Sequence, residues 1–357
     1  MYVVCSVVSS IDAGESWRDN RAADLLTNTQ PPVDPLSSGR REIRRRSTEQ
    51  RRRNNTANMS IEDNNDTMSC CASCGITEID EIKLMECDGC DLVKYCSDEC
   101  REQHKSEHEE DCKKRAAELR EELLFKQPES NHMGDCPICS LPLPYDISKS
   151  TMYNCCSKFI CDGCAHANLI REIEMRLQRS CPFCREPTAI TEEDKDKQRM
   201  KRIEANDPVA MVQEGSEQCE KGEYSSAFEC FTKAAALGDA GAHFQLSVMY
   251  RLGDGVEKED GKETYHLEEA AIGGHPIARF NLASYEYRHG NVERAVKHLI
   301  IAATQGHDHS IKVLMESFRQ GFVRKEDLTA TLRAHKAAVD ATKSPQRDEA
   351  DKFEGRV

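Results

Sequence analysis

The chain has 357 residues, a formal net charge of -14 at pH 7 and a hydrophobic content of 38%, below the roughly 45–50% that is usual for globular proteins. We therefore expect part of the chain to be unfolded, or stabilised by metal instead of by a conventional apolar core. The acidic balance argues against a general nucleic-acid binder. No run of about eighteen apolar residues is present, so we expect no membrane span.

Residues 1–69 are expected to form a disordered tail. They contain three clustered prolines, a Ser-Gly step and an end rich in Asn, Asp and Ser. Eight arginines between Arg40 and Arg53 form a basic block, which is typical of a nuclear address or an RNA-binding arm. We expect nucleic-acid binding through this tail or not at all. The alternative is a solvated tail or an upstream extension, because Met59 or Met68 could also begin a chain.

Sixteen of the nineteen cysteines lie between residues 70 and 184, most of them as closely spaced pairs. A spacing of two residues lets both thiolates bind one ion about 2.3 Å away, and four such ligands close a structural zinc site, which stabilises but does not catalyse. The candidate ligands fall into two successive sets of eight, so we expect four zinc ions. The first set is Cys71, Cys74, Cys87, Cys90, Cys96, Cys100, His108 and Cys112, and the second is Cys136, Cys139, Cys155, Cys156, Cys161, Cys164, Cys181 and Cys184.

A disulfide framework is the alternative to zinc, but a secreted scaffold would need an export signal. The apolar stretch at Met1–Ser10 is too short for one, lacks a positively charged start and runs into Asp12 and Glu15. We therefore expect an intracellular protein, cytoplasmic or nuclear, in the reducing surroundings that zinc thiolates require. Cys70 is then a spare thiol.

The first set ends in the string Lys94-Tyr95-Cys96-Ser97-x2-Cys100-x7-His108-x3-Cys112. With the pairs before it, this string resembles the MYND zinc finger family, and we place that domain at residues 70–112. The resemblance implies a hairpin and a helical end around two ions, and a shallow groove for proline-containing peptides. In this sequence Lys105 replaces the usual aromatic residue, and Arg101 the usual Gln. The implied ligand groups are Cys71, Cys74, Cys96 and Cys100 on one ion, and Cys87, Cys90, His108 and Cys112 on the other.

The second set begins Cys136-Pro137-Ile138-Cys139 and ends Cys181-Pro182-Phe183-Cys184-Arg185, and these ends resemble a RING domain at residues 136–186. The resemblance implies a cross-braced fold in which Ile138, Pro182 and Arg185 dock a ubiquitin-conjugating enzyme. The sequence departs from the family where Cys155 and Cys156 are adjacent, and His166 is the alternative ligand. The implied groups are Cys136, Cys139, Cys161 and Cys164 on one ion, and Cys155, Cys156, Cys181 and Cys184 on the other.

Three further segments have recognisable patterns. Residues 113–127 carry Ala and Leu at three- and four-residue steps, which predicts a helix within a linker at residues 113–135. Apolar residues at helical spacing over 168–178 suit the central helix of a RING. Residues 187–206 form a charged connector, for which a helix is one possibility.

From residue 207 onward the chain contains an internal repeat, with starts separated by 32, 36 and 32 residues, a period typical of stacked helix pairs. The string Gly253-Asp254-Gly255-Val256 and the Ala-Ala-x2-Gly endings resemble Sel-like repeats, relatives of the tetratricopeptide family. The resemblance implies a helical array over residues 207–342, with a groove for a peptide or partner domain. A disordered tail is expected at 343–357. The four starts are Asp207, Asp239, His275 and His307.

The expected fold class is therefore multidomain: two small zinc-stabilised cross-braced modules and then an all-α helical-repeat solenoid, after a disordered tail. The sequence offers no phosphate-binding Gly loop and no three-ligand zinc site beside a Glu base. The leading hypothesis is an adaptor that acts as a RING-type ubiquitin ligase without a covalent intermediate, placing a ubiquitin-charged conjugating enzyme near a client on the repeats. The alternative is a non-catalytic scaffold that uses both zinc modules and the repeats as binding surfaces.

Overall fold

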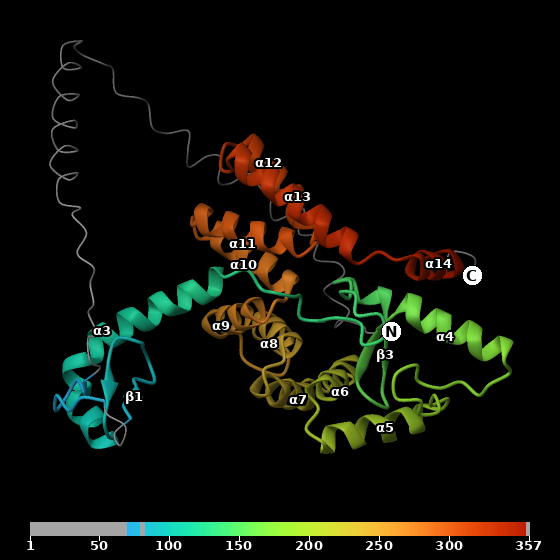
Figure 1. Ribbon diagram of the computed structural model, residues 1–357, viewed down its shortest axis with the longest axis horizontal. Helices are drawn as coiled ribbons and strands as arrows, with labels where there is room; N and C mark the ends of the chain where they lie inside the picture. Colours follow the sequence, from blue (N-terminus) through green and yellow to red (C-terminus); the bar gives the residue numbers. More distant parts are fainter. Residues whose placement is uncertain (1–69, 79–82, 355–357) are drawn as a thin grey trace, which may run out of the picture. The chain divides into compact units, whose positions relative to one another are not determined.

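The computed structural model describes residues 70–78 and 83–354, and our expectations for the tail 1–69 and for residues 355–357 lie outside this part. The chain divides into two compact units, with the boundary between Leu119 and Arg120, inside the helix that Figure 1 labels α3 (Asp98–Phe125). None of the described helices is both long enough and apolar enough to cross a membrane.

The first unit contains a short hairpin. β1 (Met85–Glu86) and β2 (Lys94–Tyr95) pair antiparallel, with Met85 opposite Tyr95. The buried residues of its core are Cys71, Leu84 and Tyr95. So small a core cannot stabilise a fold by burial alone, which leaves the stabilisation to metal.

The helix that the sequence predicts at residues 113–127 is the second half of a longer one, α3 (Asp98–Phe125). Acidic residues in its first turn, Asp98 and Glu99, favour a helix N-terminus. The apolar pattern does not reveal the first half of α3, because candidate metal ligands occupy three positions there: Cys100, His108 and Cys112.

In the second unit a hairpin and a helix form a small cysteine-rich module. After the 3-10 turn η1 (Ile147–Lys149), β3 (Ser150–Tyr153) pairs antiparallel with β4 (Lys158–Cys161), and α4 (Asp162–Glu174) follows directly. The helix predicted over 168–178 therefore begins and ends earlier, and Arg176 leaves the helical conformation with a φ of 50°. The buried core of this module consists of Cys136, Leu143, Ile160 and Cys161.

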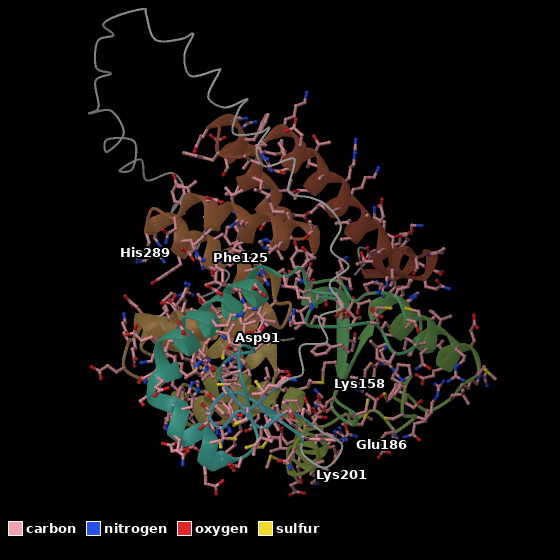
Figure 2. The ribbon with its side chains drawn as sticks, turned by 60° about the vertical axis from the view of Figure 1, so that its left-hand side comes forward. Asp91, Phe125, Lys158, Glu186, Lys201 and His289 are labelled. Carbon is pink, nitrogen blue, oxygen red and sulfur yellow. The ribbon has the colours of Figure 1, made fainter. Side chains whose placement is uncertain are left out.

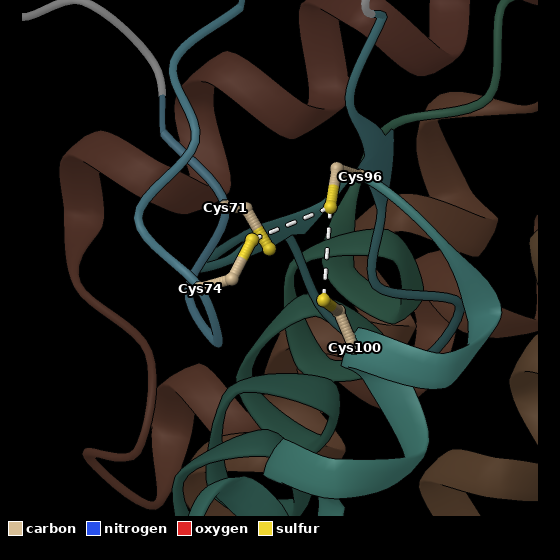
Figure 3. Close-up of side chains that lie close together, drawn as sticks. All are labelled: Cys71, Cys74, Cys96 and Cys100. Atoms are coloured by element: carbon tan, nitrogen blue, oxygen red, sulfur yellow. Dashed lines mark hydrogen bonds between the residues drawn. The ribbon is translucent and has the colours of Figure 1, made fainter.

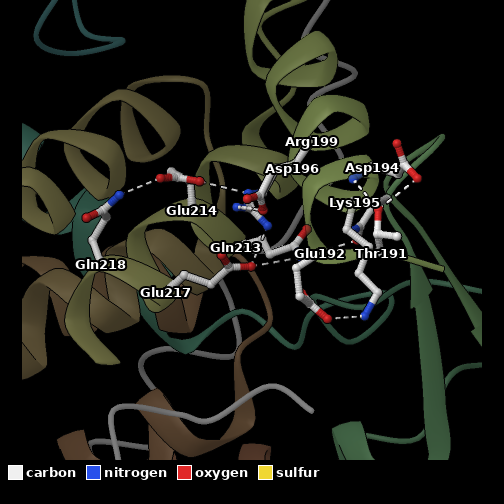
Figure 4. A network of polar contacts seen from close by, with 11 residues as sticks. Thr191, Glu192, Asp194, Lys195, Asp196, Arg199, Gln213, Glu214, Glu217 and Gln218 are labelled. Atoms are coloured by element: carbon white, nitrogen blue, oxygen red, sulfur yellow. Dashed lines mark hydrogen bonds and ion pairs between the residues drawn. The ribbon is translucent and has the colours of Figure 1, made fainter. Parts of the chain in front are cut away.

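The charged connector forms the helix α5 (Glu192–Glu204), whose first turn is capped by the Thr191 hydroxyl. Arg199 on α5 is 4% exposed and donates hydrogen bonds to Asp196, at 2.6 Å, and to Glu214 and Glu217 on α6 (Pro208–Glu220) (Figure 4). A buried guanidinium is tolerated only when carboxylates pair with it. This network therefore fastens α5 to the first helix of the repeats.

The helical-repeat prediction is confirmed, because the four predicted starts are the N-cap residues of α6, α8, α10 and α12. A second helix follows each of these. The remaining helices are α7 (Tyr224–Ala236), α8 (Ala240–Leu252), α9 (Asp260–Ile272), α10 (Pro276–Arg288), α11 (Val292–Thr304), α12 (Asp308–Arg319) and α13 (Lys325–Ala341).

Side chains at matching repeat positions fill the space between these helices. Phe244 and Phe280 are each 4% exposed, so they belong to the interhelical core. Leucines recur one repeat apart with at most 1% exposure: Leu246, Leu282 and Leu314. The glycines after α7, α9 and α11 have left-handed backbones that end each helix, with φ of 85° at Gly238, 83° at Gly274 and 92° at Gly306.

The predicted disordered tail at 343–357 is wrong for most of its length. Pro345–Glu354 forms the helix α14, which packs on α4. Ala350 is only 2% exposed and Arg347 only 9%. The apolar pattern of this short, mostly polar segment is too sparse to predict a packed helix, and its partner lies far away in the sequence.

Replacing Leu314 by Asp should destabilise the array by roughly 4 kcal/mol, because an unpaired carboxylate would be buried at a position that is 0% exposed. Thermal unfolding of the full chain, followed by circular dichroism, measures the loss. The neighbouring Met315 is 42% exposed. Met315→Asp is therefore the matched control and should cost less than about 1 kcal/mol. Equal losses would show that the register of the repeat helices is wrong.

Candidate metal centres

Four cysteines from separate segments of the first unit meet at one point (Figure 3). Cys71 and Cys74 lie before the hairpin, Cys96 follows β2 directly, and Cys100 lies in the first turn of α3. The Cys96 sulfur lies 3.5 Å from that of Cys74 and 3.6 Å from that of Cys100. We call this group the first quartet.

The second quartet joins the hairpin to α3. Cys87 and Cys90 come from the turn after β1, and His108 and Cys112 lie four residues apart on one face of α3. The Cys90 sulfur is 3.2 Å from His108 Nε2, and the sulfurs of Cys87 and Cys112 are 3.7 Å apart. A side-chain carbon at Gly89 would lie 2.9 Å from the Cys112 sulfur, so this close approach requires glycine.

A histidine that the sequence analysis overlooked supports the second quartet. His104 stacks on His108 with ring centroids 5.7 Å apart, and its Nδ1 lies 3.1 Å from the buried hydroxyl of Tyr95. Its position one helical turn before His108 was the available signal.

The second unit holds two more quartets, which alternate along the chain. The sulfurs of Cys139 and Cys161 are 3.8 Å apart, and those of Cys156 and Cys181 are also 3.8 Å apart. The hairpin and α4 place the two groups side by side, as in a cross-braced module. The third quartet is Cys136, Cys139, Cys161 and Cys164, and the fourth is Cys155, Cys156, Cys181 and Cys184.

The adjacent cysteines Cys155 and Cys156 both reach the fourth quartet. Neighbouring side chains on a strand point to opposite faces, but these two lie in the tight turn between β3 and β4, where Ser157 has a φ of 53°. His166, the alternative ligand, belongs to none of the four quartets, and its ring lies 4.9 Å from that of Phe353. Cys70 is exposed and also lies outside them.

The geometry of all four quartets fits tetrahedral zinc. In each, the four ligand atoms lie within 4.8 Å of one another. Zinc–sulfur bonds of about 2.3 Å give a tetrahedron with sulfur–sulfur edges of about 3.8 Å. The closest sulfur–sulfur distances lie between 3.3 and 3.8 Å, and every cysteine in the described part of the chain is free. Each quartet can therefore bind one metal ion, which agrees with the predicted four zinc ions.

Within the quartets, neighbouring thiols have divergent pKa values. Burial raises the pKa of Cys71, but backbone hydrogen bonds at Cys74 and Cys96 outweigh this effect and lower it to about 6. The hydrogen bond with Cys74 raises the pKa of Cys96 to about 12. The hydrogen bond between Cys161 and Cys136 lowers the pKa of Cys136 to about 4 and raises that of Cys161. One thiolate thus forms readily in such a group, and further ionisation needs a cation to offset the repulsion.

The three predicted docking residues have different surroundings. Ile138 is 43% exposed in the loop of the third quartet. Pro182 is buried, so its ring is not available as a surface contact, and we correct the predicted docking surface accordingly. The next residue, Phe183, is 46% exposed and is the apolar side chain that this loop presents.

Arg185 is exposed, and its guanidinium donates a hydrogen bond to Asn168 Oδ1 at 3.1 Å. Asn168 on α4 donates in turn to Glu172 at 2.9 Å. Glu172 is 4% exposed and accepts from the backbone amide and the hydroxyl of Ser180, at 3.0 and 2.9 Å. This network, which the sequence analysis missed, ties the loop of the fourth quartet to α4 and orients Arg185.

Part of the repeat surface is filled by the chain's own segment 120–134. Arg120 pairs with Glu268 of α9 at 2.8 Å. Leu124 is 2% exposed, and its carbonyl accepts a hydrogen bond from the fully buried Arg279 of α10. The ring of Phe125 (labelled in Figure 2) lies 4.6 Å from that of His298 on α11. A client cannot occupy this part of the array without displacing the segment.

A cleft of about 1210 Å³ remains open between the module of the third and fourth quartets and the helices α5, α6 and α14. Its walls carry both charge signs, including Lys195 on α5 and Glu217, Glu220 and Lys221 at the end of α6. The cleft can therefore accept a polar segment with mixed charges.

We expect the purified 357-residue chain to contain four zinc ions, and Cys155→Ser to contain three, because the fourth quartet would lose one of its four ligands. Elemental analysis after gel filtration measures the ratio. Cys70→Ser is the matched control and should retain four ions, since Cys70 lies outside the quartets. If Cys155→Ser still contains four ions, Cys155 is not a zinc ligand. Two or fewer ions in the wild type would show that one of the two zinc modules does not bind metal as predicted.

Residues 71–112 match the family model of the MYND finger, and residues 210–239, 240–275 and 276–307 match that of the Sel1 repeat. A curated relative, the "Putative RING finger protein ORF96" of Ostreid herpesvirus 1 (isolate France), is 34% identical over 53 residues, which are 15% of this chain and 22% of the viral protein. Both solved structures named next are 22% identical to this chain. The Sel1 repeat protein from Oxalobacter formigenes has a TM-score of 0.37, with 49% of this chain and 71% of that chain covered. The protective antigen c5321 of uropathogenic Escherichia coli has a TM-score of 0.34, with 46% and 37% covered.

The chain therefore carries a MYND finger at residues 71–112 and Sel1 repeats at residues 210–307, with two further cysteine quartets between them that fit RING-like zinc sites, and this combination of modules indicates a protein-interaction adaptor.

Proposed function

We propose that this adaptor is a RING-type ubiquitin ligase, which positions a ubiquitin-charged conjugating enzyme near a client protein and forms no covalent intermediate. The observation that carries the proposal is the alternation of the third and fourth quartets, with Ile138 exposed in one zinc loop and Arg185 exposed just after the other. The name of the herpesvirus relative supports the same reading. The proposal places the protein in a reducing intracellular compartment, cytoplasmic or nuclear, where zinc-binding thiols persist.

The proposed chemistry is positional. Each quartet supplies four ligands, so a tetrahedral ion there has no open position for water or substrate. The rate increase comes from orientation, because holding a thioester beside a client lysine makes their reaction effectively unimolecular. Ile138 supplies an apolar contact for the conjugating enzyme. Arg185, held by Asn168, supplies a cation that can bridge that enzyme and its ubiquitin.

The open cleft is the proposed place for the client. It lies in the same unit as Ile138 and Arg185, and its wall at α6 belongs to the first repeat. The charges of both signs along its walls favour a polar client segment over an apolar one. Client binding in this cleft does not require the part of the repeat surface that segment 120–134 covers.

The MYND finger adds a second contact, for a peptide. Arg101 pairs with Asp88 and Asp98 at 2.6 Å each, and Lys105 pairs with Glu102 at 3.1 Å. This side of α3 is therefore charged where the family carries an aromatic residue. We propose that the peptide is selected by polar contacts more than by stacking on an aromatic ring.

Ile138→Ala and Arg185→Ala should each slow ubiquitin discharge from a charged conjugating enzyme at least tenfold, which corresponds to about 1.4 kcal/mol of transition-state stabilisation. Single-turnover discharge onto free lysine measures the rate, with a panel of conjugating enzymes. Both side chains are exposed and neither is a candidate zinc ligand, so zinc content and thermal stability should stay at the wild-type level.

Arg176→Ala is the matched control for Arg185→Ala. Both arginines are exposed, lie in the same module and have left-handed backbones, with φ of 50° and 64°. Ile190, which is 90% exposed, provides the apolar control. An active wild type with two fully active docking variants would contradict the docking surface. No activity with any conjugating enzyme would favour the non-catalytic scaffold instead.

A further inference from the structure

The C-terminal helix α14 packs against the RING-like module. Lys149 pairs with Asp351 at 2.7 Å, and the ring of His166 lies 4.9 Å from that of Phe353. Ala350 is 2% exposed. The helix therefore shares a buried contact with a module that lies about 200 positions earlier in the chain.

Within this contact, Arg347 reaches the ligands of the third quartet. Its Nη2 donates to the Cys139 sulfur at 3.7 Å and to the Leu141 carbonyl at 3.3 Å. Its Nη1 donates to the carbonyl of Pro142 at 2.8 Å and to that of Thr342, the residue that caps the end of α13, at 2.6 Å. The side chain is 9% exposed, so water does not replace these contacts easily.

The backbone of α14 approaches α4 as closely as a glycine allows. A side-chain carbon at Gly163, next to the ligand Cys164, would lie 2.7 Å from the Arg347 amide nitrogen and 2.8 Å from the Gln346 carbonyl carbon. Gly163 is the second residue of α4, and it is buried in the first turn of that helix. The close packing of α14 explains why glycine stands there.

We propose that Arg347 is a positioning residue for the third metal site, and that α14 therefore contributes to metal binding by the RING-like module. A four-thiolate zinc site carries a charge of about -2, and a fixed guanidinium beside one sulfur offsets part of it. The same side chain holds the carbonyls of the chain leaving Cys139, which fixes the direction of that sulfur. Partners of this kind determine how tightly the metal is held.

Arg347→Met should make one of the four zinc ions easier to remove, with a loss of affinity of about 10–100-fold. The measurement is zinc release from the full chain to 4-(2-pyridylazo)resorcinol over a chelator series. Arg347→Lys keeps the positive charge but loses the planar guanidinium with its several N–H donors. It should therefore bind zinc more tightly than Arg347→Met but less tightly than the wild type. Lys352→Met removes an exposed cation from the same helix and should release zinc like the wild type. In a Cys139→Ser chain, which already lacks this site, Arg347→Met should release no further ion.

Gly163→Ala gives an independent test that leaves Arg347 in place. The added methyl group displaces α14, while alanine itself favours α4. The proposal predicts that the same single ion becomes easier to remove. It is overturned if Arg347→Met and Gly163→Ala both hold all four ions as tightly as the wild type, or if Arg347→Met weakens a site other than the third.

Discussion

Four ligand atoms held within 4.8 Å of one another repel when they ionise, and the folding of both zinc modules depends on how this repulsion is removed. The described cysteines form no disulfides, and the buried cores of the two zinc modules contain only three and four residues. Burial alone cannot offset the conformational entropy of such small modules. A divalent ion in each quartet offsets part of the thiolate charge and supplies the missing folding energy.

The elements around the quartets follow from this requirement. Helix α3 carries His108 and Cys112 on one face, and the turn before β4 directs two adjacent cysteines at one point. In the second unit, side chains that are not metal ligands hold the loops that carry the ligands. The network of Asn168 and Glu172 holds one zinc loop, and Arg347 holds another. The repeats rest on ordinary apolar packing between helices, which is why they need no metal of their own.

Much of this could be predicted from the sequence, because ligand spacing and repeat periods are local signals. The four quartets group as the family resemblances imply, and Asp207 and His275 cap helices at the predicted starts. Features that depend on packing between distant segments could not be predicted from these local signals. The helix α14 is stabilised by a module about 200 positions away, and Pro182 is buried although its motif suggests a surface contact. The early start of α3 was hidden because metal ligands replace apolar residues there.

X-ray absorption at the zinc edge of the purified full chain tests the central claim most directly. The four quartets contain fifteen cysteines and one histidine. We therefore expect an average zinc shell of almost four sulfur atoms at about 2.3 Å, with a minor nitrogen contribution at about 2.0–2.1 Å. An average shell with three or fewer sulfurs, or with oxygen ligands, would contradict four closed structural sites.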